Sequence, residues 1–440
     1  MERKDETIVE KVTKLFRKGK IEMTEEFEDT LCLMEETTRN IFITGKAGTG
    51  KSTLLKHFCA TTSKKIVMLA PTGIAAVNIQ GSTIHSFFLF PFGVVRRDDV
   101  EHLHHKAEIF NNLDAIVIDE ISMVRADIMD AIDHSLRMNT GKNLPFGGIQ
   151  IIAFGDLFQL PPVVIGQERQ YFSDQYDGVY FFNANCFEEA DFETVQLTKI
   201  FRQKDTSFQR LLNRTRESLL TYEDFELFNT RHRAYENDGV PAITLASTNA
   251  IADQINSTKL RAVSGVEQAF KATLKGDFRE KDCPIDSNLK LKVGAQVMFV
   301  KNDSETPKRW VNGTIGVVKK LGEHYALVKI GKKSHHVQKA VWEIYDYQYN
   351  SQIKEVEKFE KGSFAQLPLK LAWAVTIHKS QGKTFEKAII DLGNGAFTHG
   401  QTYVALSRCT KLEGIYLRNP LRQRDIIIDQ KVLDFHKKDN

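Results

Sequence analysis

Cysteine is scarce in this sequence, and no two cysteines form a C-x-x-C pair; the residues are Cys32, Cys59, Cys186, Cys283 and Cys409. Structural zinc sites and iron–sulfur clusters need closely spaced cysteine ligands, so both are disfavoured. A secreted fold held together by disulfides is disfavoured for the same reason. The spacing predicts reduced, mostly buried thiols in a cytoplasmic protein.

Long apolar runs are also missing. No stretch approaches the length that crosses a bilayer, and the charged residues 1–6 do not resemble a signal peptide, so no membrane partner is expected. Apolar residues make up 42% and charged residues 27% of the chain, as in globular proteins. The net charge of +3 permits a nucleic-acid partner without requiring one. At 440 residues, the chain is too long for one core and predicts several domains.

The most specific pattern present is a glycine-rich loop at residues 45–52, Gly-Lys-Ala-Gly-Thr-Gly-Lys-Ser. It lies between an apolar run at 40–44 and a helical stretch at 53–58, which is the context of a phosphate-binding loop. An ordinary glycine turn before a helix is the weaker alternative. Backbone N–H groups and the helix N-terminus would surround the phosphates of ATP. The predicted nucleotide-binding residues are Gly45, Ala47, Gly48, Thr49, Gly50, Lys51, Ser52 and Thr53.

Two acids end the apolar run 115–118. Asp119 is the predicted partner of Mg²⁺ together with Ser52, and Glu120 is the predicted general base for the attacking water. Lys51 would contact the β- and γ-phosphates. An acid pair at a strand end is weak evidence by itself, because acids commonly begin loops. Together with the glycine loop, the pair completes a hydrolytic nucleotide site.

Three further polar residues are candidates for the same site. Gln159 follows an apolar run at 149–154 and would contact the γ-phosphate, although a solvent-facing turn explains it equally well. Arg202 and Arg408 lie far along the chain. A guanidinium group matches the charge on a departing γ-phosphoryl group, while a surface ion pair is the alternative for either arginine.

The order of apolar runs predicts an α/β protein. Strands are expected at 41–44, 65–70, 114–119 and 149–154, and a second unit beginning near 192 would contain strands at 194–197, 242–245, 387–390 and 414–417. Short glycine-punctuated strands at 296–300, 314–318 and 325–330 predict a small antiparallel barrel, with a long hairpin as the alternative. A phenylalanine-rich insertion at about 87–110 contains three histidines, which a solvated helix face explains better than a metal site.

Taken in order, seven segments resemble the motifs of superfamily-one helicases, most of all the Pif-type, RecD-like branch that moves 5′-to-3′ on single-stranded DNA. They are residues 45–52, 70–76, 117–123, 155–162, 197–203, 374–382 and 403–410, and the similarity spans roughly residues 40–418. Seven weak signals in sequence are far more specific than any one of them.

The resemblance implies two RecA-like domains, parallel sheets flanked by helices, with an SH3-like β-barrel insertion and a short wedge insertion. The expected boundaries are 1–191 for the first domain, with the wedge at about 87–110. The second domain takes 192–290 and 366–440, and the barrel takes 291–365. ATP and Mg²⁺ would bind Lys51, Ser52, Asp119, Glu120, Gln159, Arg202 and Arg408. The residues expected near DNA are Thr72, His85, Phe87, His378 and Lys379.

The implied activity is that of an ATP-dependent helicase, expected as a monomer in the bacterial cytosol or nucleoid, with DNA repair, recombination and telomere-type functions in the family. Single-stranded and forked DNA are the implied partners. G-quadruplex DNA and RNA–DNA hybrids are further candidates among which the sequence does not choose. A nucleotide-gated binding module and the motor subunit of a nuclease or relaxase assembly are competing interpretations.

One departure concerns adenine recognition. The family usually has a glutamine upstream of the phosphate loop, but no glutamine precedes Gln80 here. Selectivity for adenine is therefore in doubt, or a group near residues 23–27 supplies it. A second phosphate loop at residues 382–384 is excluded because position 377 is Ile rather than Gly.

Overall fold

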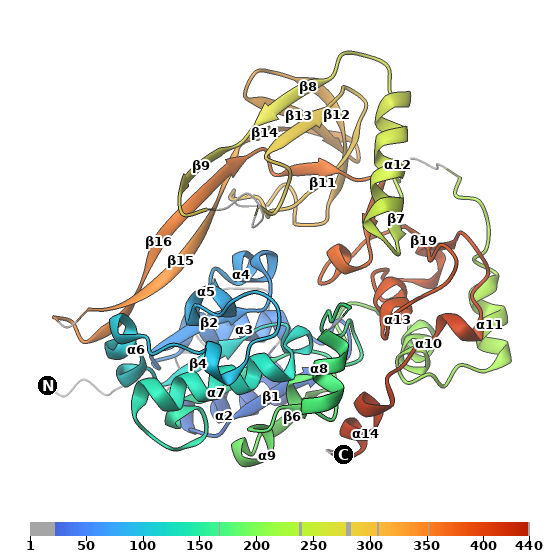
Figure 1. The fold of residues 1–440 in the computed structure, drawn as a ribbon. Helices are drawn as coiled ribbons and strands as arrows, with labels where there is room; N and C mark the ends of the chain where they lie inside the picture. The colour runs from blue at the N-terminus through green and yellow to red at the C-terminus, as the bar shows by residue number, and fades with distance from the viewer. Residues whose placement is uncertain are drawn as a thin grey trace, which may run out of the picture. The chain divides into compact units, whose positions relative to one another are not determined.

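The computed structural model describes residues 23–166, 168–236, 240–278, 283–305, 308–350 and 352–438 (Figure 1). These residues form two compact units. The first unit contains the chain up to Asp156, Val164–Lys199 and Tyr347–Phe359. The second contains Leu157–Val163, Ile200–Asp346 and the chain from Glu360 onward.

The first unit is built on a parallel sheet with the strand order β3-β2-β4-β5-β1-β6. The strands are β1 (Ile41–Gly45), β2 (Ile66–Ala70), β3 (Ser82–Thr83), β4 (Ala115–Ile118), β5 (Gln150–Phe154) and β6 (Glu193–Leu197). Every residue of β1, β4 and β5 is buried, which explains their continuous apolar sequences. The helices of this unit are α2 (Glu25–Glu36), α3 (Lys51–Thr61), α4 (Gly73–Ile79), α5 (Ile84–Phe88), α6 (Ala107–Asn112), α7 (Ala126–Thr140), α8 (Glu168–Gln175) and α9 (Phe187–Ala190).

The second unit contains a parallel sheet with the order β18-β7-β19-β20. Its strands are β7 (Ile243–Ala246), β18 (Ala374–Thr376), β19 (Ala388–Asp391) and β20 (Ile415–Leu417). Its helices are α10 (Thr206–Arg216), α11 (Tyr222–Asn229), α12 (Asn249–Ala262), α13 (Gln401–Leu406) and α14 (Gln430–Lys438). In the part of the chain that the structure describes, the helices are all too short or too polar to cross a bilayer.

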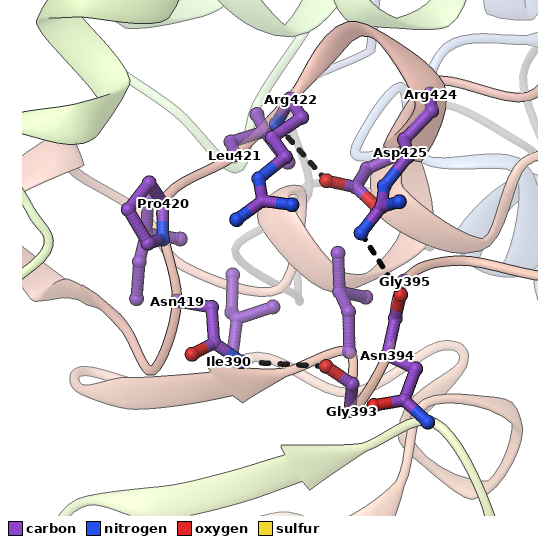
Figure 2. Close-up of a pocket in the computed structure, with 12 residues that line it drawn as sticks. Ile390, Gly393, Asn394, Gly395, Asn419, Pro420, Leu421, Arg422, Arg424 and Asp425 are labelled. Atoms are coloured by element: carbon purple, nitrogen blue, oxygen red, sulfur yellow. Dashed lines mark hydrogen bonds between the residues drawn. The ribbon is translucent and has the colours of Figure 1, made fainter.

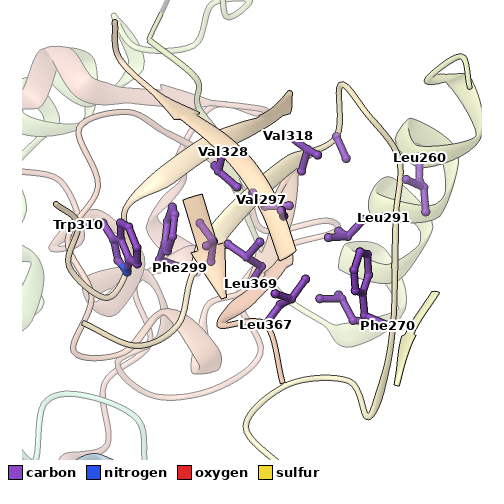
Figure 3. Close-up of a cluster of buried hydrophobic side chains, with 14 residues drawn as sticks. Leu260, Phe270, Leu291, Val297, Phe299, Trp310, Val318, Val328, Leu367 and Leu369 are labelled. Carbon is purple, nitrogen blue, oxygen red and sulfur yellow. The ribbon is translucent and has the colours of Figure 1, made fainter. Parts of the chain in front are cut away.

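Antiparallel strands connect β7 to β18 in the sequence. One sheet has the order β14-β13-β12-β11-β17, another pairs β15, β16 and β9, and a ladder joins β10 to β8. The strands are β8 (Gln268–Lys271), β9 (Thr273–Gly276), β10 (Asn288–Leu291), β11 (Gln296–Phe299), β12 (Ile315–Leu321), β13 (Tyr325–Ile330), β14 (Lys333–Gln338), β15 (Ala340–Asn350), β16 (Glu355–Gln366) and β17 (Leu369–Leu371). Figure 3 shows the core shared by the five-stranded sheet and the β10–β8 ladder, in which Phe299 and Trp310 stack beside Val297, Val328 and Leu369.

The predicted strands are confirmed with one correction of placement. The strand at 194–197 was expected in the second unit, but β6 pairs with β1 in the first sheet, from Ile41 opposite Glu193 to Gly45 opposite Leu197. Its register places the chain after β6 directly beside the glycine loop. Strand β18 was not predicted, because its residues lie in a segment, 374–382, that was assigned to a helicase motif without a strand.

Candidate functional site

The glycine loop has the backbone that a phosphate-binding loop requires. Gly48 and Gly50 have φ angles of +92° and +89°, which side chains rarely tolerate. A Cβ atom on Gly45 would lie 2.6 Å from the carbonyl oxygen of Leu197. Inside the loop, the buried Thr49 hydroxyl donates to the carbonyl of Lys46 at 3.0 Å. The turn is therefore held by its own bonds and by the close approach of β6.

Helix α3 begins at the end of this loop. Its N-cap is Gly50, and no side chain caps its first turn, so its N-terminal N–H groups suit an anion. The ammonium group of Lys51 donates to the carbonyls of Gly45 at 2.6 Å and Lys46 at 3.2 Å. Ser52 and Thr53 are exposed at the same helix start. This donor set suits a nucleotide phosphate, and the Ser52 hydroxyl could hold Mg²⁺; both assignments stay predictions.

The acid pair follows β4 in the sheet position next to β5 and β2. Burial raises the pKa of Asp119, while the Glu120 amide, which donates to its Oδ1 at 3.0 Å, and the Lys51 ammonium act in the opposite direction. Glu120 has a φ of +53°, the left-handed conformation, so the chain turns sharply at this point. Strained backbone of this kind is common at functional sites and directs the carboxylate away from the strand path.

A catalytic role of Glu120 can be distinguished from a structural role by one substitution. In a Glu120→Gln variant the side chain keeps its size and loses its basicity, so we expect near-normal nucleotide binding and hydrolysis slower by about 10²–10⁴-fold. Binding of a fluorescent ATP analogue and steady-state hydrolysis measure the two separately. Glu108→Gln, an exposed acid on α6, is the control. Equal loss of binding and hydrolysis would show that Glu120 is structural.

Both predicted arginines of the second unit lie at the end of α13, where they share Ser407. Arg408 is 1% exposed and donates to the Ser407 hydroxyl at 2.7 Å and the Val404 carbonyl at 2.8 Å. Arg202 donates to the Ser407 carbonyl at 3.3 Å, and burial lowers its pKa. The surface ion-pair alternative is wrong for Arg408, because its partners are a hydroxyl and backbone carbonyls within the core.

Gln203 fixes this arrangement and was not recognised as a separate site residue. Its buried amide donates to the carbonyls of Ser407 at 3.2 Å and Cys409 at 3.1 Å. The bonds tie the segment before α10 to the turn after α13, which positions Arg202 and Arg408 together. The sequence placed Gln203 in a helicase-like segment, residues 197–203, but only the fold shows which groups its side chain contacts.

Gln159 lies in Leu157–Val163, a segment that clusters with the second unit. Its carbonyl approaches α13 so closely that a Cβ on Gly400 would lie 2.3 Å away. Its side-chain Oε1 accepts from Gln381 Nε2 at 3.3 Å. Beside it, the guanidinium of Arg216 lies 3.6 Å from the ring centre of Phe158. The solvent-facing alternative for Gln159 is therefore wrong, because the residue is 8% exposed.

Two predicted nucleic-acid contacts lie beyond the carboxyl ends of β2 and β3 in the first unit. Thr72 caps α4 through a bond from the Ala75 amide at 3.3 Å, and it is half-buried. His85 on α5 stacks on Phe92, with ring centres 5.8 Å apart and an angle of 13° between the planes. Phe92 is 71% exposed, so this pair presents an aromatic surface.

Phe87 does not share that surface. It is fully buried, packs edge-on against Phe88 and Phe110, and lies under the ammonium group of Lys106 at 4.6 Å. A ring without exposed surface cannot stack on a base, so the structure corrects the prediction that Phe87 contacts DNA. Phe88 and Phe90 are buried as well, so these three rings form a core for the insertion.

The predicted contacts of the second unit follow β18. His378 is half-buried, and burial lowers its pKa, while Lys379 is exposed. Two lysines that the sequence did not single out accompany them. Burial lowers the pKa of Lys370 to about 7 and that of Lys383 to about 8. Lys370 lies on β17, so its place in this cationic group depends on the strand pairing.

The segment 23–27, expected to help in base recognition, begins α2. Thr24 caps the helix through the amide of Phe27 at 3.3 Å, and Phe27 is buried. The Glu26 carboxylate accepts from the Thr198 amide at 3.2 Å and from the Thr198 hydroxyl. Glu26 thus holds the chain that leaves β6 in place, next to the strand that contacts the glycine loop.

Known proteins match this chain in both sequence and structure. A sequence profile of the PIF1-like helicase family matches residues 24–223. The ATP-dependent DNA helicase Pif1 of Bdellovibrio bacteriovorus is 33% identical, and the match covers 95% of this chain and 92% of that protein. The ATP-dependent DNA helicase PIF1 of Danio rerio is also 33% identical, but this chain spans only 61% of its length.

Solved structures of Pif1 from Bacteroides cover 95% of this chain and 97% of their own. The complex with ADP-AlF4 is 39% identical with a TM-score of 0.88, and the form bound to single-stranded DNA is 40% identical with a TM-score of 0.70. The predicted α/β class with two RecA-like domains and β insertions is thereby confirmed. Matched over nearly its whole length by such relatives, the chain belongs to the PIF1-like helicase family.

Proposed function

We propose that this protein is an ATP-dependent DNA helicase that moves 5′-to-3′ along single-stranded DNA and separates duplexes. The observation that carries the proposal is a hydrolytic half-site on one unit and a fixed arginine pair on the other. Lys51 and Glu120 belong to the first unit, and Arg202 and Arg408 belong to the second. The Bacteroides relative solved with ADP-AlF4 and with single-stranded DNA supports both ligands.

In this proposal the phosphate loop and Lys51 hold the β- and γ-phosphates, and Ser52 and Asp119 hold Mg²⁺, which would neutralise phosphate charge. Glu120 orients and deprotonates the attacking water. Gln159 contacts the γ-phosphate, and Arg202 and Arg408 stabilise charge on the departing phosphoryl group. Because the two sets of residues belong to separate units, binding and hydrolysis would alternate between closed and open states.

The strand would be held by both units, by Thr72 and His85 on the first and by His378 and Lys379 on the second. The exposed stack of His85 and Phe92 offers a base-stacking surface near the point of strand separation. Stacking on an aromatic side chain contributes about 1–3 kcal/mol per base. This is comparable to the mean of about 1.4 kcal/mol that holds a base-pair step of DNA.

Several finer assignments belong to the same proposal. The preferred partners are single-stranded and forked DNA, with G-quadruplex DNA and RNA–DNA hybrids as further substrates, and the working unit is a monomer. The 5′-to-3′ direction rests on family resemblance. We also propose that residues 291–365 are an SH3-like insertion and that the protein acts on DNA in a bacterial cytosol or nucleoid, as expected of a chain with bacterial relatives.

The test combines ATP hydrolysis with strand displacement. We expect single-stranded DNA to stimulate hydrolysis, and a duplex with a 5′ tail to be unwound in preference to one with a 3′ tail. A rate that stays flat at saturating DNA would reject the motor. Stimulated hydrolysis without displacement from either substrate would instead indicate a nucleotide-gated binding module, and preference for the 3′ tail would reverse the direction.

A further inference from the structure

A cavity of about 430 Å³ lies in the second unit, away from the residues assigned above. It opens at the carboxyl ends of β19 and β20 and is lined by the turn Gly393–Gly395 and the segment 419–425. Its floor is apolar and includes Ile390, Leu417 and Leu421. The volume falls within the range of about 300–1,000 Å³ typical of ligand sites. Crevices at the carboxyl ends of parallel strands are where α/β sheets commonly bind ligands.

Two guanidinium groups supply the charge of this cavity. Figure 2 shows Arg422 and Arg424 extending over it from one side, opposite Asn394. Arg424 donates to the Asn394 carbonyl at 3.4 Å. Among the described residues, no carboxylate lies within ion-pair distance of either guanidinium. The lining carboxylate, Asp425, instead accepts from the Arg422 amide at 2.9 Å and the Ala396 amide at 3.4 Å.

The wall opposite the arginines is rigid. Gly393 has a φ of +62°, and its amide donates to Asp391 at 3.0 Å. A Cβ on Gly395 would lie 2.9 Å from Asp425 Oδ1, so the turn packs directly against that carboxylate. Asp391 also pairs with Arg418 at 3.0 Å, which leaves Arg422 and Arg424 as the uncompensated charges. The cavity therefore has an anion-binding side, an apolar floor and amide groups at its edge.

The sheet connects this cavity to the proposed path of the strand. Strands β18, β7, β19 and β20 are parallel, so their carboxyl ends share one edge. His378 and Lys379 follow β18 at that edge, and the cavity lies two to three strands away, at β19 and β20. At a spacing of about 4.8 Å per strand, the separation is about 10–14 Å, which a few nucleotides can span.

We propose that the cavity holds a phosphate group of the same single strand that His378 and Lys379 contact, with Arg422 and Arg424 as its ligands. The inference rests on the proposed function, because it extends the contact between the strand and the second unit. Planar guanidinium groups suit phosphate oxygens, and the apolar floor suits the attached sugar and base. The site would add one phosphate contact with the single-stranded DNA to those predicted for His378 and Lys379.

The test is a series of oligothymidylates shortened one nucleotide at a time, titrated by fluorescence anisotropy at several salt concentrations. In the unmodified protein, affinity should rise in a step at the length that reaches the cavity. In an Arg422→Gln, Arg424→Gln double variant this step should disappear, leaving binding of long oligonucleotides about tenfold weaker. Each lost phosphate contact should also reduce the salt slope by about 0.7. Shorter oligonucleotides should bind as before.

Two controls separate charge from structure. The Arg422→Lys, Arg424→Lys double variant keeps the positive charge and should keep most of the step in affinity. Arg261→Gln, at an exposed arginine of α12, should leave the affinity for every oligonucleotide unchanged. Equal weakening at every length, or no weakening at any, would overturn the inference. The inference would also be overturned if an acidic peptide bound the unmodified protein but not the glutamine double variant, while the two proteins bound DNA with equal affinity. If the unmodified protein binds no oligonucleotide, the proposed function itself fails.

Discussion

A Lys51→Ala variant should lose ATP turnover by at least about 10²–10³-fold, the cost of removing one preorganised electrostatic contact from a reacting group. The ammonium group of Lys51 lies on the glycine loop, bonded to the carbonyls of Gly45 and Lys46. It also opposes the effect of burial on Asp119, so the pKa of Asp119 should rise further without it and the carboxylate should hold Mg²⁺ less well. Hydrolysis measured by phosphate release checks the expectation.

The matched control is Lys56→Ala. Lys56 lies on the same helix, is exposed and contributes a weaker electrostatic effect on Asp119, so its removal should leave turnover near normal. A thermal unfolding midpoint for each variant shows whether the loop is intact. Near-normal turnover by Lys51→Ala would refute the nucleotide site. Equal losses of turnover in both variants would show that the loss comes from removing positive charge on the helix, not from removing a specific phosphate contact.

Arg408→Ala should lower kcat by on the order of 10³–10⁵-fold while changing ATP affinity far less. The reason is that, in the proposed function, the guanidinium group acts on charge that develops only in the transition state. The side chain is held by Ser407 and Val404, so its position is fixed before ATP arrives. Single-turnover hydrolysis and equilibrium binding of a nucleotide analogue separate the two effects.

Because Arg408 is buried, truncation also leaves a void, and a second variant is needed. Arg408→Lys retains the charge but lacks the planar fork, so we expect a folded protein with a strongly reduced kcat. Arg231→Ala removes another buried arginine of the second unit, one that donates to the Ile415 carbonyl at 3.0 Å, and should cost stability without a specific loss of kcat. An unchanged kcat in Arg408→Lys and Arg408→Ala would remove the arginine from the site.

Much of the fold could be predicted because parallel strands covered on both faces are continuous apolar runs, as in β1 and β4. The assignment of β6 failed for a physical reason. A strand's sequence shows that it is buried, but its partner is chosen by the path of the intervening chain, which brought β6 back to β1. The three-residue β18 was also missed, although the equally short β20 was predicted.

The site was predictable where one short segment contains all of its parts. The glycine loop is such a segment, and its backbone has the conformation that its spacing indicated. Residues whose role depends on distant partners were missed or misassigned. Gln203 and Lys370 acquire their roles through Ser407 and β17, respectively. Phe87 illustrates the opposite error, since an aromatic residue beside a predicted nucleic-acid contact was assigned to a surface when it fills a core.

The left-handed backbone at Glu120 has a consequence for how this protein can be improved. Holding a glutamate at a φ of +53° costs roughly 1–2 kcal/mol, a penalty that glycine would avoid. Glycine at position 120 should therefore raise the free energy of unfolding, and under the proposed function it would also remove the general base. Under that proposal, stability and hydrolysis place opposite demands on this one residue.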